Sequence, residues 1–81
     1  MATTRMLQAL FTDALDLPPD TRFEQLSYRS LPQWDSVAHM RLVARLEAEF
    51  DLMLDTDEVI DMSSFTVCKE ILARHGVHFD D

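Results

Sequence analysis

Apolar residues recur every three or four positions in four segments of this 81-residue chain, and this spacing predicts four helices. The first segment begins at Thr3 or Thr4, because either residue can cap a helix. It ends before Pro18-Pro19, because proline cannot continue a helix. The residues expected to face the core are Leu7, Leu10, Phe11, Ala14 and Leu15.

The second segment has the clearest helical pattern, with Asp35 as its expected N-cap. Apolar residues repeat at helical spacing after this cap and are expected to face inward: Val37, Met40, Val43, Leu46 and Phe50. Polar and small residues are assigned to the outer face: Ala38, His39, Arg41, Arg45 and Glu49. Leu52 and Leu54 are expected to continue the buried surface through the next loop.

Two shorter patterns follow. Asp55 and Glu58 have the spacing of a capping box, which predicts a short helix with Val59 and either Ile60 or Met62 facing inward. The last helix is expected to begin near Ser63-Ser64 and to end at Gly76. Its expected buried residues are Phe65, Val67 or Cys68, Ile71 and Leu72. The tail from 77 to 81 is expected to fray.

The connection between the first two helices is long, from about Asp16 to Asp35. It has room for a short helical turn and carries apolar residues that would pin it to a core: Leu17, Phe23, Leu26, Tyr28 and Leu31. The whole pattern predicts an all-α fold, a small antiparallel four-helix bundle of three main helices and one short helix with a long first loop. The chain is long enough for one domain over 1–81, with a core at about 3–75.

The charge of the chain makes some classes of function less plausible than others. The formal net charge is −8, which disfavours nucleic-acid binding, because that contact requires a basic surface. Acidic residues are concentrated between Glu47 and Asp61, where no Lys or Arg occurs. Such a stretch can attract a basic partner surface, or it can be a solvated face that keeps the protein in solution. It lacks the glycine and glutamate spacing of a calcium-binding loop.

The single cysteine and the N-terminal segment bear on the compartment and on metal binding. Cys68 is the only cysteine, so an internal disulfide is impossible, and no Cys or His spacing indicates a metal site. The N-terminal segment has no continuous apolar stretch, since Asp13 and Asp16 interrupt it. We therefore expect no membrane span, a cytoplasmic location and no metal.

Ser36 lies where the second helix begins. Helix-start chemistry alone accounts for an Asp35-Ser36 pair. The wider segment, however, resembles the acyl carrier protein family, whose hallmark is Asp-Ser-Leu at the head of a helix that ends in Leu-Glu-x-x-Phe. These motifs read Asp35-Ser36-Val37 and Leu46-Glu47-Ala48-Glu49-Phe50 here. Further matching residues are Leu31, Trp34, Leu42-Val43, Leu52, Leu54, Asp57-Glu58 and Ser63-Ser64-Phe65.

The resemblance implies a carrier and not an enzyme. A phosphopantetheinyl transferase would attach 4'-phosphopantetheine from coenzyme A to Ser36, and the thiol of this arm would carry acyl groups as thioesters. Asp35 would cap the helix and take part in recognition by the transferase. A helix N-terminus suits a phosphate group, because its free N–H groups and dipole favour negative charge.

The implied partners are the transferase and the enzymes that load and transfer acyl groups, with no nucleic acid, no membrane and a monomeric carrier. The expected partner-binding residues are Val37, Met40, Arg41, Glu47, Asp57 and Glu58. Arg41 and Arg45 occupy an outer face that is normally acidic in this family. This difference favours a specialised pathway, such as polyketide, hybrid or surface-polysaccharide biosynthesis, over housekeeping fatty-acid synthesis.

An acyl chain could be sheltered by the apolar lining of the bundle, or the core could be closed. The candidate lining residues are Val37, Met40, Val43, Leu46, Met62, Phe65 and Ile71.

Three alternatives remain. The first is an aminoacyl or peptidyl carrier, which the absence of glycine before Ser36 disfavours. The second is an acidic helical adaptor in which Ser36 is never modified. The third is a hydrolase built on Ser36 and His39, which lacks a glycine-rich turn and an evident orienting acid.

Overall fold

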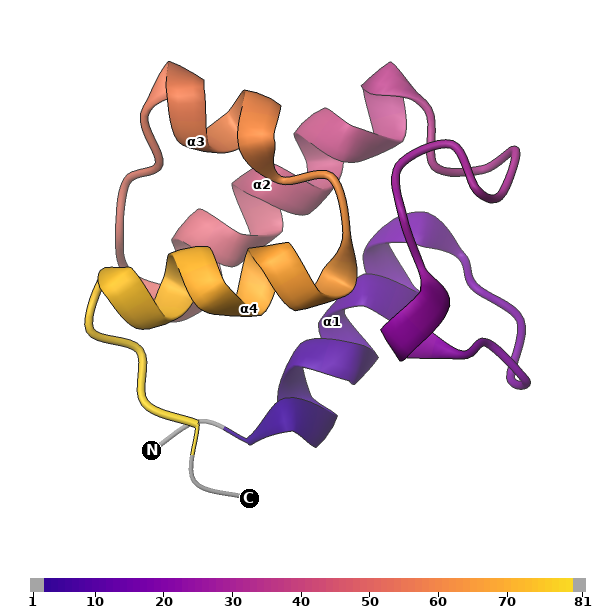
Figure 1. Ribbon diagram of the computed structural model, residues 1–81, viewed down its shortest axis with the longest axis horizontal. Helices are drawn as coiled ribbons and strands as arrows, with labels where there is room; N and C mark the ends of the chain where they lie inside the picture. Colours follow the sequence, from indigo (N-terminus) through magenta and orange to yellow (C-terminus); the bar gives the residue numbers. More distant parts are fainter. Residues whose placement is uncertain (1–2, 80–81) are drawn as a thin grey trace.

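The computed structural model describes residues 3–79 of the chain. This part contains four α-helices and one short 3-10 turn, joined by loops. The helices are α1 (Thr4–Leu15), α2 (Ser36–Phe50), α3 (Thr56–Asp61) and α4 (Phe65–Arg74), and the turn η1 is Phe23–Gln25. In Figure 1, α3 lies above α4, α1 lies below it, and α2 passes behind. The prediction of an all-helical fold is confirmed for these residues.

Side chains cap the helices as the sequence predicts. Thr3, and not Thr4, caps α1 by accepting the N–H of Met6. Asp35 caps α2, and Ser64 caps α4. Asp55 and Glu58 form both halves of the predicted capping box of α3, with bonds of 2.8 and 3.1 Å. At the far end of α4, Gly76 takes a φ of 91°, a left-handed conformation that suits glycine.

The core lies between the helices and contains three aromatic rings that contact edge to face. The ring of Phe11 lies 4.9 Å from Phe65 and 5.8 Å from Trp34, between centroids. All five predicted core positions of α1 are buried, and Phe65, Cys68, Ile71 and Leu72 of α4 are buried as well. Leu54 is buried and Leu52 packs against the core, as expected for the loop after α2.

The predicted inward face of α2 is partly wrong. Val37 and Met40 are exposed by 66% and 58%, whereas Ala38, assigned to the outer face, is buried. The buried residues of this helix are Ala38, Leu42, Val43 and Leu46, with Phe50 packed at the edge. At about 100° per residue, Val37 points away from the side that these four share. The first turn of α2 therefore carries a second apolar stripe, which faces solvent.

The long connection is held to the core through both its backbone and its side chains. Leu17 and Leu26 are buried, and Phe23 and Leu31 pack against the core. The expected helical turn is η1. The carbonyl of Leu26 accepts the N–H of Phe65 at 3.1 Å, which ties η1 to the start of α4.

The structure decides between the two residues expected to face inward near the end of α3, and it corrects the expectation of a frayed tail. Of the two candidates for the inner side of α3, Met62 is fully buried and Ile60 is 70% exposed. The tail is not frayed through Phe79. The Val77 N–H donates to the Leu72 carbonyl at 3.1 Å, and the Phe79 ring packs edge-on to Phe50. The expected fraying of 80–81 lies outside the described residues.

Candidate functional site

Ser36 is the first residue of α2 and is exposed to solvent. The helix start does not depend on its side chain, because the Asp35 carboxylate accepts the N–H of Ala38 at 2.9 Å. The Asp35 carbonyl accepts the N–H of His39 at 2.8 Å and so begins the helical ladder. None of the hydrogen bonds within residues 3–79 uses the Ser36 hydroxyl. An electrophile can therefore approach this oxygen without the helix losing its cap.

The segment before Ser36 is anchored by Trp34, which is fully buried. The indole Nε1–H donates to His39 Nδ1 at 3.0 Å, and the two rings stack with centroids 6.0 Å apart. The Trp34 carbonyl accepts the N–H of Arg29 at 3.2 Å. Tyr28 packs edge-on against both Trp34 and His39. The exposed Ser36 thus lies two residues after a fully buried, hydrogen-bonded side chain.

The surface that flanks Ser36 on α2 is apolar and basic. The exposed residues of this helix face are Val37, Met40, Arg41, Ala44, Arg45 and Ala48. Arg45 forms an ion pair with Asp13 of α1 at 2.6 Å. No ion pair found within residues 3–79 engages Arg41. On a chain with a net charge of −8, this face is a local exception.

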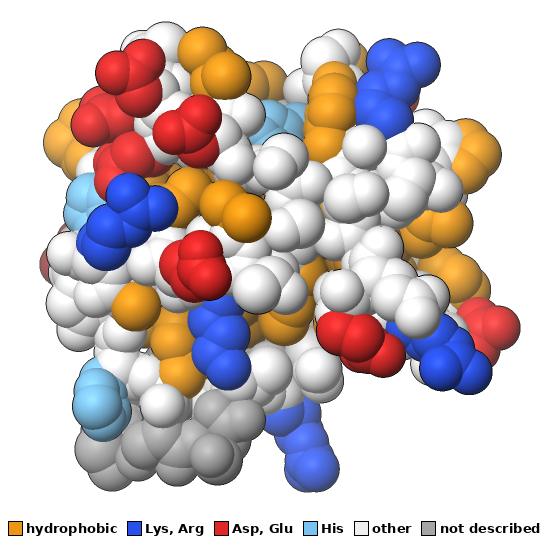
Figure 2. Space-filling model, in the orientation of Figure 1, with side chains coloured by type: hydrophobic (Ala, Val, Ile, Leu, Met, Phe, Trp, Pro, Cys, Tyr) orange, Lys and Arg blue, Asp and Glu red, His pale blue; other side chains and the backbone are white. Residues whose placement is uncertain are grey.

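The acidic residues lie elsewhere. Figure 2 shows acidic side chains gathered at the end of the molecule where α3 lies, and α3 with its cap carries Asp55, Asp57, Glu58 and Asp61. Glu58 is bonded to His75 after α4, with Nε2 2.8 Å from each carboxylate oxygen. This hydrogen bond, followed by the bond from the Asp55 N–H, lowers the pKa of Glu58 below its ordinary value of 4.5.

The six predicted partner-binding residues therefore fall into two groups. Val37, Met40, Arg41 and Asp57 are exposed. Glu47 and Glu58 are half-buried and engaged, since Glu47 Oε2 accepts the N–H of Leu54 at 3.0 Å. These two carboxylates hold the protein's own loops and helices together. Sequence periodicity gives no signal for such contacts.

His39 makes no hydrogen bond to Ser36, although the two residues are three positions apart. Its Nδ1 contacts Trp34, and its Nε2 lies 2.9 Å from the carbonyl oxygen of Val59 in α3. The ring is half-buried between these partners, not part of the outer face to which the sequence pattern assigned it. In this arrangement His39 makes no contact through which it could act as a base for Ser36.

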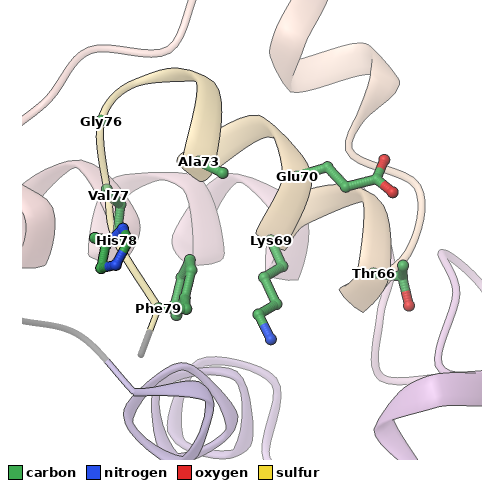
Figure 3. A pocket seen from close by; sticks show the side chains of 8 residues that line it. All are labelled: Thr66, Lys69, Glu70, Ala73, Gly76, Val77, His78 and Phe79. Carbon is green, nitrogen blue, oxygen red and sulfur yellow. The ribbon is translucent and has the colours of Figure 1, made fainter. Parts of the chain in front are cut away.

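Two hollows of the surface were considered as places where a group attached near the start of α2 could lie. A cleft of about 260 Å³ lies between the long loop and α3, lined by Tyr28, His39, Val59, Ile60, Met62 and Ser63. A groove of about 470 Å³ lies between α4 and the tail, where the side chains of Lys69 and Phe79 extend into the same space (Figure 3). Ser36 lines neither hollow. The groove is the larger and has no lining residue from α2, whereas His39 of α2 lines the cleft.

The seven candidate residues for sheltering an acyl chain do not form one cavity in this structure. Val37 and Met40 lie on the surface. Val43, Leu46, Phe65 and Ile71 are packed in the core and line neither hollow, and only Met62 reaches the cleft.

Comparison of the chain with protein-family models, with curated proteins and with solved structures finds no significant match in any of the three. Between residues 3 and 79, no helix has the length and apolar character needed to cross a bilayer. The same residues bring together no group of three or more His, Cys, Asp or Glu side chains that could hold a metal ion.

Proposed function

We propose that this protein is an acyl carrier protein, with Ser36 as the attachment site of 4'-phosphopantetheine. The observation that carries the proposal is the division of labour at the start of α2. Asp35 caps the helix through its carboxylate, while the hydroxyl of the next residue is exposed and unused. A serine that served only to begin the helix would be expected at the capping position itself.

The chemistry of attachment suits this position. The Ser36 oxygen would form a bond to the phosphorus that carries the pantetheine arm in coenzyme A. The pyrophosphate bond would break, the adenosine bisphosphate would leave, and a base of the transferase would accept the hydroxyl proton. The resulting phosphodiester would stand at the N-terminus of a 15-residue helix, whose first N–H groups and dipole favour an anion.

The proposal extends to the setting of the protein. It includes the antiparallel bundle of the carrier family, a monomer without catalytic activity of its own, and a cytoplasmic location, which fits the single unpaired cysteine. The phosphopantetheinyl transferase and the enzymes that load and transfer the acyl group would contact the exposed face beside Ser36. Because this face carries Arg41 and apolar Val37 and Met40, it suits enzymes of a specialised pathway that present apolar and acidic groups.

The decisive experiment is intact-mass measurement after incubation with coenzyme A and a broad-specificity phosphopantetheinyl transferase. The wild-type chain should gain the mass of one arm, and Ser36→Ala should gain none. Ser63→Ala is the matched control, because Ser63 is also exposed, and it should be modified as the wild type is. A folded wild-type protein that stays unmodified would favour the unmodified adaptor instead.

The same assay can distinguish the two proposed roles of Asp35, capping of α2 and recognition by the transferase. Asp35→Asn retains a side-chain oxygen that can cap α2, whereas Asp35→Ala removes the cap. If recognition by the transferase requires the carboxylate charge, Asn should slow arm attachment while leaving the thermal stability close to that of the wild type. Equal rates for Asn and wild type would limit Asp35 to capping.

The nature of the cargo is a separate question that the same site poses. Mass spectrometry of the protein purified from its native host would weigh the attached group directly. An aminoacyl or peptidyl mass on the arm would assign the chain to the peptidyl carriers, and an acyl mass would support the proposal as stated.

A further inference from the structure

Two histidines hold the short helix α3 in place. No residue of α3 is fully buried, so its position depends on contacts with its neighbours. On one side, His39 of α2 bonds the carbonyl of Val59 at 2.9 Å. On the other side, His75 at the end of α4 bonds both carboxylate oxygens of Glu58 at 2.8 Å.

The partners of His39 permit one protonation state only. The indole Nε1 of Trp34 is a donor and never an acceptor, so His39 Nδ1 must present its lone pair. The backbone oxygen of Val59 is an acceptor only, so His39 Nε2 must carry the hydrogen. Both bonds form together only when the imidazole is neutral and carries its proton on Nε2.

Protonation of His39 breaks this arrangement. A second hydrogen on Nδ1 would face the indole N–H, so one of the two groups must move away. Trp34 is fully buried and cannot turn its N–H to solvent, whereas His39 is half-buried and lines the cleft. The imidazolium ring is therefore the group expected to move, toward the cleft, and this movement breaks its hydrogen bond to the carbonyl of Val59.

Within residues 3–79, no carboxylate forms an ion pair with His39 that would compensate the charge. The loop contributes the Tyr28 ring at 5.4 Å, and α3 contributes the Val59 carbonyl and the side chains that line the cleft. The acidic groups of α3 are the exposed Asp57 and Asp61 and the engaged Glu58. On α2, the Asp35 carboxylate is bonded to Ala38, and no ion pair within residues 3–79 includes His39.

The contact between His75 and Glu58 responds to protonation in the opposite way. A protonated His75 still donates Nε2–H to Glu58, and its charge strengthens the bond to an ionised carboxylate. Protonation of the two histidines therefore weakens the bond from α3 to α2 and strengthens the bond from α3 to α4.

We infer that His39 is a proton-sensitive latch: when neutral it ties α3 to α2 beside the cleft, and when protonated it releases α3 and lets the cleft widen. Its consequence for an arm on Ser36 rests on the proposed carrier function, since access to the cleft beside that arm would then depend on pH. The latch itself is a property of the unmodified chain and can be tested there.

Trp34 is the only tryptophan, so its indole N–H signal in the ¹⁵N spectrum of the full, unmodified chain reports on the latch. The signal is followed in a series from about pH 8 to about pH 5, the range in which histidine is the usual pH-sensitive side chain. The indole signal and the amide signals of α3 should shift together over this series. At about pH 8 the His39 ring should show the Nε2–H tautomer.

His39→Gln is the matched variant, because a glutamine amide can accept from Trp34 and donate to Val59 without titrating. It should abolish the pH-dependent shift of the indole signal, and His75→Gln should retain it. An apolar fluorescent dye, anilinonaphthalene sulfonate, should bind several-fold more at about pH 5 than at about pH 8 in wild type. His39→Ala should bind it at both values, and His39→Gln at neither.

Four outcomes would overturn the latch. These are an indole signal that stays fixed in wild type, a shift that persists in His39→Gln, an Nδ1–H tautomer at about pH 8, and a loss of helical circular dichroism in step with the indole shift. Arm attachment is measured separately by mass. A chain that shows the latch but accepts no arm would refute the carrier proposal alone, and a modified chain without the pH response would refute the latch alone.

Discussion

Glu58 and His75 join α3 to the end of α4, with His75 Nε2 2.8 Å from both oxygens of the carboxylate. The same glutamate completes the capping box with Asp55, so one side chain serves both the start of a helix and a contact between helices. Its lowered pKa reflects both roles.

The first prediction follows from that pKa. Because the pKa of Glu58 is lowered on folding, its stabilising effect is present above the ordinary glutamate range and is lost as the pH falls through the lowered value. Glu58→Gln keeps a capping side chain but removes the charge. The melting temperature of wild type should exceed that of Glu58→Gln at about pH 6, and the gap should close in strong acid.

Glu49→Gln is the control for that comparison, since Glu49 is exposed on α2. Its melting temperature should follow that of wild type across the series. A gap for Glu58→Gln that is constant with pH would show that the pair with His75 contributes nothing through its charge.

Glu47 should prove to be a structural residue. Its carboxylate accepts the N–H of Leu54 and closes the loop between α2 and α3. Removing an acceptor from a half-buried N–H costs about 1 kcal/mol, so Glu47→Ala should lower the free energy of unfolding by that amount in urea. Glu47→Ala should accept the arm at the wild-type rate at a temperature where it is folded, and a slower rate would restore the partner-binding role.

The exposed apolar stripe beside Ser36 should matter to the transferase and not to folding. Val37→Glu and Met40→Glu should leave the melting temperature almost unchanged, because neither side chain is buried. Each should lower kcat/KM for arm attachment by about tenfold, the effect of losing an apolar contact worth about 1.4 kcal/mol. Met53→Glu is the matched control, since Met53 is 83% exposed in the loop after α2. An equal loss of rate in Met53→Glu would indicate a general charge effect.

Cys68 should be inert in the native protein. The thiol is fully buried, and burial raises its pKa to about 12. Iodoacetamide at about pH 8 should leave the unmodified native chain unlabelled and should label it once after unfolding in urea. After arm attachment, the native chain should gain one label, on the thiol of the arm. Labelling of Cys68 in the native state would mean that the core opens readily around α4.

Most of the fold follows from periodicity, because buried helices have simple rules. Phe11 and Leu72 occupy positions that a regular apolar repeat identifies, and the capping box at Asp55 is a local motif. The error at Val37 and Met40 has a physical origin. Apolar residues that serve a surface repeat at the same spacing as those that serve a core, so one sequence cannot separate the two stripes.

The site was predictable only in part. Asp35 and Ser36 are adjacent in sequence, so a helix-start pattern finds them. The contacts of His39 with Trp34 and Val59 join a loop and two helices, and no spacing rule links residues that the fold brings together from three elements. The long loop fixes Trp34, and only the folded chain shows that an apparent surface histidine is half-buried.

Lys69, the only lysine of the chain, contacts both ends of the described structure. Its Nζ donates to the Thr4 hydroxyl at 2.6 Å and lies 5.3 Å from the centre of the Phe79 ring. In Figure 1 the start of α1 lies low in the molecule, whereas the start of α2 lies at the upper right. One ammonium group therefore holds the start of α1 and the last described residue together, on the side of the molecule remote from the start of α2.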